Sequence, residues 1–512
     1  MLHMMICARI ILVPLLVAGA ISAQARQGQP PPGLTSPEKL PAQTPQLLLP
    51  AIDAEALRRA DQDTRSGLQG AHDKRLAVAH GFPVNVDSTS DGNWQVLENG
   101  DLLWSLTLKA PGATDLHLGF ETYALSNGAQ LWVTGSNSYF EGPYDSADAA
   151  PLWIPVVPGD SATIELRLPA GSAIEDNKLA LTHVGAGYRD LFHAEPRIGS
   201  PGASGACNIN VVCPLGQPYS DEARALAYYE FQSGPTTYIC TATLLNDVPG
   251  DRKNYVLTAA HCMSTQTEVA SMRLYWNYQS TSCASTTGYS FLQNQTGAVL
   301  RATRDDADFT LVELNQNPDP AWNLFHAGWD ATGIAPATTI GLHHPSGDVA
   351  KVTLGPGPSE GNNCIGTGGG SVNTHWFTGP YQQGTTEGGS SGSGVWIPVG
   401  DSSGSGRRLI GVLSGGTALC AGTVPDSGYD CYGKFSAGWN GPAPSSRLRD
   451  WLDPASTGTL SIAGINNVQS TVNVDSVLVN RVIAERQASQ MRDEERGPFE
   501  RPVPFNPGVR RD

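Results

Sequence analysis

A glycine-rich stretch around two serines, residues 387–394, constrains the fold of this chain more than any other feature. Glycine tolerates backbone bends that residues with a Cβ resist, and here it flanks Ser390 and Ser391 on both sides. The apolar segment 395–397 follows at once. Such a bend can present a serine hydroxyl and aim backbone N–H groups at one point, which are the requirements of acyl transfer. The alternative is a Gly/Ser linker without chemistry.

Two upstream stretches favour the chemical interpretation. His261 follows the strand-like run 255–257 in the sequence T-A-A-H-C, and Asp308 opens the apolar, β-branched run 309–314. The resulting order of His, Asp and Ser is that of the chymotrypsin group and differs from the orders in subtilisin and in α/β-hydrolases. The serine stretch also lacks the final glycine of G-x-S-x-G, which argues against a lipase-type elbow.

Length and composition favour an exported protein built from more than one unit. A chain of 512 residues exceeds one ordinary domain, so two or three units are expected. Charged residues make up only 16% and glycines number 57, which suits a loop-rich, β-rich extracellular protein. The net charge of −16 argues against a nucleic-acid partner, because such proteins usually carry a basic patch.

The N-terminus has the features of a secretory signal peptide. Arg9 precedes the apolar run 10–21, and Ala-Gln-Ala at 23–25 supplies a cleavage pattern. A membrane anchor is the alternative, but the run is shorter than the roughly 20 residues that a span needs. We therefore expect a secreted protein with no membrane partner.

The cysteine count suggests disulfides. Removal of the signal peptide takes Cys7 with it and leaves eight of the nine cysteines, an even number in an exported protein. A zinc site is the alternative, but the chain has no C-x-x-C pair. The adjacent His343 and His344 lack a third spaced ligand, so packed or surface histidines are favoured over a metal site. Neither a metal nor a cofactor is expected.

The N-terminal part is predicted to be a tether followed by a small β-sandwich. Residues 26–50 are proline-rich and polar, as in an extended tether, and Asp53 can cap a short helix. Apolar residues alternate with period two over 94–168. Asn-Gly pairs at 99–100 and 127–128 each separate two alternating runs, which is a strong hairpin signal.

The composition changes at a Gly/Pro/Ala/Ser linker over 197–205, and all eight remaining cysteines lie beyond it. The region 206–458 has short strands and frequent turns, as a β-barrel requires. A short helix within 445–452, capped by Ser445, is predicted at its end. The charged, proline-bearing C-terminal tail is expected to be disordered.

This second region closely resembles the bacterial lysyl endopeptidases, which are secreted chymotrypsin-like serine proteases. The resemblance runs from about residue 204 to 458 and rests on long blocks of sequence. The matching blocks are SGACNINVVCP at 204–214, YWNYQ at 275–279, DFTLVEL at 308–314, AGWD at 327–330, HHP at 343–345 and DWLDPASTG at 450–458. It implies a double β-barrel protease domain. With the N-terminal β-sandwich predicted from the alternating pattern, which is most simply a prodomain, the whole chain is expected to be all-β.

Carried over residue by residue, the resemblance implies a catalytic triad. Ser391 would be the nucleophile, His261 its general base, and Asp308 the group that orients and stabilises the imidazole. Asp305 and Asp306 lie close by in sequence, but Asp308 opens the D-F-T-L pattern.

The resemblance also implies the residues that hold the substrate. The backbone N–H groups of Gly389 and Ser391 would form the oxyanion hole. Asp430 matches the carboxylate at the floor of the pocket, where a lysine ammonium would be its partner. The remaining substrate-binding positions are Ser414, Gly415 and Gly416, which match the segment that pairs with the substrate backbone, and Trp376.

Two departures from the family concern this pocket. The family has a histidine at the position of Ser414, where it helps to stack a tryptophan, here Trp376, against the catalytic imidazole. Cys364 and Cys431 have no counterpart, so a disulfide between them beside the pocket is left open. The other six cysteines would form the family's pairs, which are Cys207 with Cys420, Cys213 with Cys283, and Cys240 with Cys262.

These observations predict a signal peptide at 1–25, a propeptide at 26–200, a protease domain at 201–460 and a tail at 461–512. A basic junction, Arg197-Ile198, lies in the linker before the protease. In trypsin-like zymogens an aspartate beside the nucleophile captures the new N-terminus, but here that position is Ser390. Activation is therefore predicted to proceed by release of the propeptide.

The expected function is that of a secreted, monomeric serine endopeptidase that cuts proteins and peptides after lysine, with its own propeptide as a partner. A compact carboxylate suits an ammonium, whereas a guanidinium needs a planar, bidentate site. The alternatives are a trypsin-like enzyme that accepts lysine and arginine equally, and a catalytically inactive, protease-like binding protein. The N-terminal sandwich could also be a permanent binding module.

Overall fold

The structure is a computed structural model that describes residues 28–36, 44–67, 72–191, 202–366, 372–399 and 407–467. The described residues up to Asn467 belong to one compact unit. No helix in these ranges is long and apolar enough to cross a membrane. The predicted signal peptide, the junction Arg197-Ile198 and residues 468–512 lie outside them.

The N-terminal part consists of two mainly antiparallel sheets that share one apolar core, as the alternating pattern predicts. The first sheet contains β1 (Gln46–Leu48), β4 (Asn93–Val96), β5 (Leu102–Lys109), β7 (Gln130–Thr134), β8 (Phe140–Tyr144) and β11 (Ser161–Leu168). The second contains β3 (Leu76–Asp87), β6 (Asp115–Ala124), β9 (Leu152–Trp153), β10 (Val157–Pro158) and β12 (Lys178–Gly187).

One of the two predicted hairpins is present and the other is not. Strands β4 and β5 pair across the Asn-Gly turn at 99–100, with Val96 opposite Leu102. The Asn-Gly turn at 127–128 instead connects β6 to β7, which belong to different sheets. The prediction of a second hairpin was wrong because apolar alternation shows that a strand has a buried face, but not which neighbour it pairs with.

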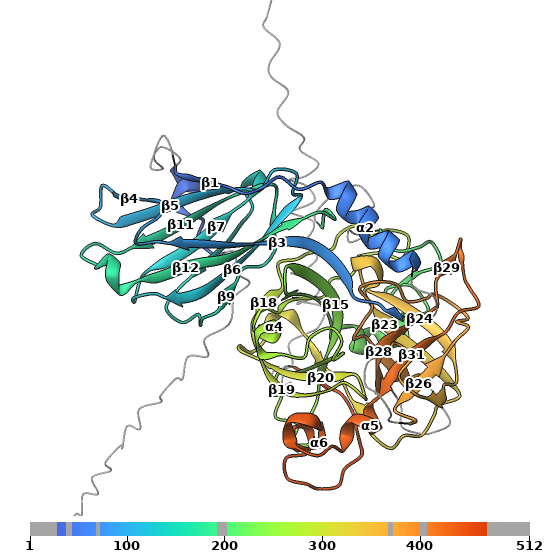
Figure 1. Cartoon of the computed structure of the whole chain (residues 1–512). Helices are drawn as coiled ribbons and strands as arrows, with labels where there is room; N and C mark the ends of the chain where they lie inside the picture. The colour runs from blue at the N-terminus through green and yellow to red at the C-terminus, as the bar shows by residue number, and fades with distance from the viewer. Residues whose placement is uncertain are drawn as a thin grey trace, which may run out of the picture. The chain divides into compact units, whose positions relative to one another are not determined.

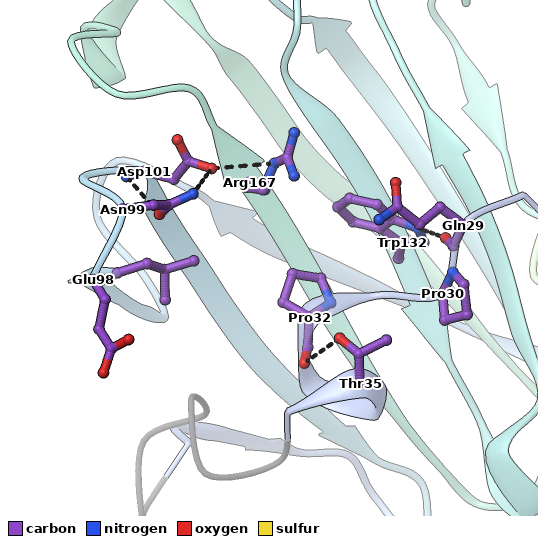
Figure 2. Close-up of a pocket in the computed structure, with 10 residues that line it drawn as sticks. Gln29, Pro30, Pro32, Thr35, Glu98, Asn99, Asp101, Trp132 and Arg167 are labelled. Carbon is purple, nitrogen blue, oxygen red and sulfur yellow. Dashed lines mark hydrogen bonds and ion pairs between the residues drawn. The ribbon is translucent and has the colours of Figure 1, made fainter.

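Part of the predicted tether is anchored to the sandwich. Residues Pro32–Thr35 form a helical turn, α1, and β1 pairs in parallel with β5. The Trp132 indole donates to the Gln29 carbonyl at 2.9 Å, and Figure 2 shows Pro30 and Pro32 in the same pocket. The next helix, α2 (Ala54–Gly67), is capped as predicted, because the Ala56 N–H donates to Asp53 Oδ1 at 2.9 Å.

The continuation of the second sheet and a further, mainly antiparallel sheet curl into the predicted pair of β-barrels. The first is built from β14 (Leu226–Ser233), β15 (Thr236–Leu245), β16 (Tyr255–Thr258), β17 (Arg273–Trp276), β18 (Asn294–Thr296), β19 (Ala298–Arg304) and β20 (Phe309–Leu314). The second is built mainly from β13 (Ile209–Asn210), β23 (Thr338–His343), β24 (Lys351–Pro356), β25 (Ser359–Gly361), β26 (His375–Thr378), β27 (Gly394–Ile397), β28 (Arg408–Gly416) and β31 (Asp430–Lys434). The all-β prediction with a double barrel is confirmed.

Strand β3 joins the N-terminal sheet to the first barrel. It pairs with β12 along one edge and with β15 along the other, so one sheet continues through both (Figure 1). Just before it, the two-residue strand β2 (His72–Asp73) pairs with β28 of the second barrel. Residues 72–80 therefore contact both barrels.

The C-terminal end differs from the prediction in two details. The short helix α6 is a single turn, Arg449–Leu452, with no side-chain cap, so the Ser445 cap is not formed. Within the predicted tail, β32 (Ser461–Ile462) pairs with β22 (Trp329–Asp330), and β33 (Ile465–Asn466) pairs with β21 (Phe325–His326). Strand pairing therefore orders residues that the predicted division had placed at the start of the disordered tail, 461–512.

Candidate active site

The pairing of two strands brings His261 and Asp308 together, although 47 positions separate them in the sequence. Strands β16 and β20 are neighbours, with Thr258 opposite Thr310. His261 lies three residues after the end of β16, and Asp308 lies immediately before β20. Both therefore emerge at the same edge of the first barrel.

Asp308 holds the imidazole of His261 from two directions. Its Oδ2 lies 2.9 Å from His261 Nδ1, and its Oδ1 accepts the backbone N–H of His261 at 2.9 Å. The backbone of Asp308 has φ of 46°, a left-handed conformation that few side chains adopt without compensation. The hydrogen bonds to His261 stabilise the carboxylate in this conformation.

Burial and charge act in opposite directions on this pair. Burial favours the neutral imidazole, but the charge and hydrogen bonds of Asp308 outweigh it, so the pKa of His261 is raised. Burial likewise opposes the charged carboxylate, but His261 and the surrounding hydrogen bonds hold the pKa of Asp308 below its usual value. The arrangement therefore stabilises an imidazolium beside an ionised carboxylate.

The glycine-rich bend presents Ser391 to this imidazole. Ser391 Oγ lies 2.7 Å from His261 Nε2. Gly389 has φ of 96°, and a Cβ there would lie 2.8 Å from the carbonyl oxygen of His344. Glycine is required at Gly392 as well, since φ is 81° and a Cβ would lie 2.1 Å from Thr258 Oγ1. The three residues predicted as a triad are thus joined by hydrogen bonds.

Two backbone N–H groups on this bend converge on one oxygen atom. The carbonyl oxygen of Lys74 accepts from Gly389 N at 2.5 Å and from Ser391 N at 3.4 Å. These are the two donors predicted for an oxyanion hole. Lys74, from the segment between α2 and β3, therefore lies where the carbonyl of a substrate would be expected.

The side chain of the same lysine ends at Asp430, the residue predicted to form the floor of the substrate pocket. Lys74 Nζ lies 2.7 Å from Asp430 Oδ1, and both side chains are buried, with exposures of 2% and 0%. The ammonium also donates to Ala418 O at 2.9 Å, Thr386 Oγ1 at 2.5 Å and Thr386 O at 3.1 Å. A buried ammonium is thus surrounded by acceptors, as its desolvation requires.

The second oxygen of the pocket carboxylate is occupied by protein hydroxyls. Asp430 Oδ2 accepts from Tyr381 at 2.8 Å and from Thr386 Oγ1 at 2.7 Å. Only Oδ1 of Asp430 faces the ammonium. A guanidinium needs two parallel acceptors in one plane, so this pocket suits an ammonium better.

The segment predicted to pair with a substrate backbone lies beside the pocket. Gly415 and Gly416, at the end of β28, pair with Asp73 and His72. A Cβ on Gly415 would lie 2.1 Å from the His72 carbonyl oxygen, so glycine is needed for this approach. Ser414 is the preceding residue, and its Oγ lies 3.0 Å from His375 Nε2.

This chain has Ser414 where the family has a histidine, but another histidine, His375, lies next to it. Ser414 also forms a hydrogen bond that helps to lower the pKa of Asp308. His375 thus reaches the triad through Ser414, and burial lowers the pKa of His375 to about 4, so its ring is neutral. The neighbouring Trp376 is buried in a separate apolar cluster, with the Lys434 ammonium 4.1 Å from the centre of its ring.

Within the described residues, four disulfides link the segments around the candidate site. They include the three pairs implied by the family resemblance and the pair left open, and they are Cys207–Cys420, Cys213–Cys283, Cys240–Cys262 and Cys364–Cys431. Cys240–Cys262 fastens the residue after His261 to β15. Cys364–Cys431 is attached next to Asp430 and therefore fixes the floor of the pocket.

The adjacent histidines are both buried, and the ring of His344 packs against Tyr228 of the first barrel and against Tyr278. His343 Nδ1 lies 2.9 Å from the Oγ of Ser390, and His344 Nδ1 lies 2.9 Å from the Asp348 carbonyl oxygen. Among the described residues, no group of three or more His, Cys, Asp or Glu side chains could hold a metal ion. Ser390 is thus engaged with His343.

Sequence reasoning missed Lys74, Tyr381, Thr386 and His375. Lys74 belongs to the N-terminal part, for which the sequence predicted no role at the site. The only available signal was the basic pair Lys74-Arg75 after a helix, which by itself reads as a solvated turn. The other three act through hydrogen bonds to Asp430 and Ser414, and no sequence spacing reveals those contacts.

Comparisons with known proteins agree on both halves of the chain. Residues 48–185 match the family described as lysyl endopeptidase N-terminal domain, and residues 201–433 match the lysyl endopeptidase C-terminal domain. A lysyl endopeptidase of Pseudomonas aeruginosa is 34% identical over 304 residues, which cover 56% of this chain. The match spans 61% of the length of that relative.

Solved structures give a weaker likeness. A thermostable serine protease, AL20, from an extremophilic microorganism has 12% identity and a TM-score of 0.29, and covers 42% of this chain and 92% of its own. Protease Anisep from Arthrobacter nicotinovorans has 14% identity and a TM-score of 0.30, and covers 44% of this chain and 93% of its own. At these values neither contributes to the functional argument.

Proposed function

Because the chain belongs to the lysyl endopeptidase family, we propose that it is a secreted serine endopeptidase that cuts peptide bonds on the carboxyl side of lysine. The observation that carries this proposal is the Asp430 pocket, which holds a lysine ammonium while the carbonyl of the same lysine meets two N–H donors beside Ser391.

The hydrogen-bonded groups suit acyl transfer in two steps. Ser391 Oγ attacks the carbonyl carbon after lysine while His261 Nε2 takes its proton, and Asp308 stabilises the imidazolium. The N–H groups of Gly389 and Ser391 hold the oxyanion. His261 then donates the proton to the leaving amine, and a water molecule attacks the acyl-enzyme by the same route.

Selectivity for lysine over arginine follows from the single oxygen of Asp430 that faces the ammonium. Tyr381 and Thr386 both donate to the other oxygen, so a bidentate contact with a guanidinium would require their displacement. Unpaired buried polar groups cost free energy, so the pocket discriminates against a longer, planar cation.

The direct test is cleavage-site profiling on a denatured protein mixture. We expect cleavage after lysine and little after arginine, and no cleavage by Ser391→Ala. Equal cleavage after both residues would favour the trypsin-like alternative. An inactive, protease-like binding protein would show neither cleavage nor Ser391-dependent labelling by a serine-directed phosphonate.

Secretion and maturation complete the proposal. The four disulfides suit an oxidising, extracellular compartment. Residues 26–200 would be a propeptide, residues 201–460 the protease domain, and protein and peptide substrates the partners. Mass spectrometry of the secreted protein tests this division, because a permanent N-terminal binding module would remain attached. Maturation at the same bond in an Arg197→Gln variant would argue against the Arg197-Ile198 junction.

A further inference from the structure

The segment from His72 to Leu76 crosses the candidate active site in the manner of a bound peptide. Upstream, His72 and Asp73 pair with Gly416 and Gly415 of the second barrel. Downstream, Leu76 pairs with Ile239 on β15 of the first barrel. The chain is therefore extended on both sides of Ser391, with Lys74 between the two pairings.

The two predicted oxyanion donors and the nucleophile contact Lys74 directly, and the general base reaches it through the nucleophile. Its carbonyl oxygen accepts the N–H groups of Gly389 and Ser391. Its own N–H donates to Ser391 Oγ at 2.9 Å, and that Oγ is 2.7 Å from His261 Nε2. Ser391 Oγ is therefore adjacent to the Lys74 carbonyl carbon, and the general base His261 contacts Ser391 Oγ.

The residue after Lys74 is also held. The Arg75 guanidinium donates to the His261 carbonyl oxygen at 3.1 Å and lies 4.8 Å from the ring centre of Tyr238. The bond between Lys74 and Arg75 is thus fixed on both sides relative to Ser391. Positioning of this kind is a large part of what lowers the barrier to acyl transfer.

We propose that the Lys74–Arg75 peptide bond is an internal substrate of this enzyme, and that the segment closes the site to other peptides until it is cut and displaced. This inference rests on the function proposed above and adds a cleavage site inside the N-terminal domain. It also assigns the segment a regulatory role, because Ser391 and Asp430 are both fully buried while Lys74 is in place.

The reaction is an intramolecular hydrolysis. Ser391 Oγ bonds to the Lys74 carbonyl carbon as its proton passes to His261, and the C–N bond to Arg75 then breaks as His261 protonates the Arg75 amine. Water hydrolyses the acyl-enzyme and regenerates Ser391. The products are a chain ending in the Lys74 carboxylate and a chain beginning with the Arg75 amine.

Both ends remain attached after the bond is cut, which makes the segment a slow substrate. On the Lys74 side, the helix α2 is held by Arg58, which donates to the Tyr188 carbonyl oxygen at 2.5 Å, and by Asp61, which pairs with Arg189. On the Arg75 side, β3 stays paired with β12 and β15. The retained amine can re-form the peptide bond from the acyl-enzyme, so inhibition persists until the fragments separate.

The first experiment maps the cut in the full chain. The protein is refolded at several concentrations, and its fragments are followed by intact mass and N-terminal sequencing. We expect a fragment beginning at Arg75 that accumulates at a rate independent of protein concentration, and none from Ser391→Ala. Lys178→Gln, which changes an exposed lysine of the same domain, should behave as wild type.

The second experiment measures access to the site. A lysyl phosphonate should label uncut Lys74→Gln at least about 10-fold faster than it labels uncut wild-type protein. The reason is that the Lys74 side chain no longer competes with the phosphonate for the site. Equal labelling rates would overturn the regulatory role. If Lys74→Gln fails to fold, Lys74→Arg tests the same competition.

The two proposals fail in different ways. A wild-type chain that cuts lysyl peptides in solution but keeps the Lys74–Arg75 bond intact would overturn the internal substrate alone. A chain that cuts neither would overturn the proposed peptidase itself.

Discussion

Lys74 and Asp430 form a buried ion pair across 356 positions of sequence, with Nζ 2.7 Å from Oδ1. The carboxylate belongs to the second barrel and the ammonium to the segment between α2 and β3. This ion pair is the basis of the proposed lysine specificity, which substitutions at Asp430 and at Tyr381 test.

Replacing Asp430 by asparagine should abolish the recognition of lysine. Losing one partner of a buried, hydrogen-bonded charge pair typically costs about 2–5 kcal/mol. We therefore expect kcat/KM for a lysyl peptide to fall by roughly 30- to 4,000-fold, since each 1.4 kcal/mol is about tenfold. Steady-state kinetics measures this loss, with the exposed Asp251→Asn as the control. An unchanged kcat/KM would place the specificity pocket elsewhere.

Replacing Tyr381 by phenylalanine should shift selectivity toward arginine. The change removes one of the two hydroxyls that occupy Asp430 Oδ2 and so makes that oxygen available to a guanidinium. A hydrogen bond to a charged group contributes about 1.5–3 kcal/mol, so cleavage after lysine should fall roughly tenfold or more. Paired lysyl and arginyl peptides give the ratio. Tyr255→Phe, in the first barrel, should leave that ratio unchanged.

The pH profile should report the pKa of His261. General-base catalysis needs the neutral imidazole, and Asp308 raises the pKa of that group in the occupied site. The single-turnover rate should therefore fall tenfold per pH unit below the pKa of His261. That pKa should be higher than the pKa of an ordinary histidine. Asp308→Asn should lower kcat by about 10⁴-fold, as loss of the orienting carboxylate does in other triads. A rate that is flat across the acidic range would exclude His261 as the base.

The Cys364–Cys431 disulfide should affect the pocket as well as stability. It closes a loop with a sequence separation of 67, and Cys213–Cys283 closes one of 70. Removing either pair with serine substitutions should lower the free energy of unfolding by about 2–4 kcal/mol. Only the loss of Cys364–Cys431 should raise KM for lysyl peptides, because Cys431 adjoins Asp430. Denaturant titration and kinetics on the two variants separate the effects.

The contact between the N-terminal sheet and the first barrel should weaken as the pH rises. His117 on β6 lies 2.9 Å from Asp115 and 3.2 Å from Glu230 of β14, all three buried. Burial opposes the charged ring, but Glu230 and Asp115 outweigh it and raise the pKa of His117. Arg273 and His183 also face this cluster, and the pKa of His183 is lowered to about 4 by burial and by Arg273.

The raised pKa of His117 sets the direction in which stability changes with pH. The stabilisation is fully present below the ordinary histidine value of about 6.5, and it is lost as the pH rises through the folded value. In the Ser391→Ala background, which prevents self-cleavage, the urea midpoint should fall between pH 6 and 9. His117→Gln should remove that part of the slope. An identical slope in both chains would contradict the assignment.

The sequence by itself determined the all-β fold class and identified as a candidate triad the three residues that the structure joins by hydrogen bonds. Period-two alternation and turn residues report strand faces directly, and the glycines around Ser391 are required locally by positive φ. The three implied disulfides followed from the resemblance, and the structure contains the same pairs.

Only the tertiary structure decided which strands pair and what fills the pocket. The turn at 127–128 crosses between sheets, and Tyr381 and Thr386 reach Asp430 through space. Lys74 lies next to Ser391 only because β2 and β3 pair with different barrels, and the sequence does not show that pairing. Local preferences fix how each strand is formed, but long-range pairing and side-chain contacts depend on the whole folded chain.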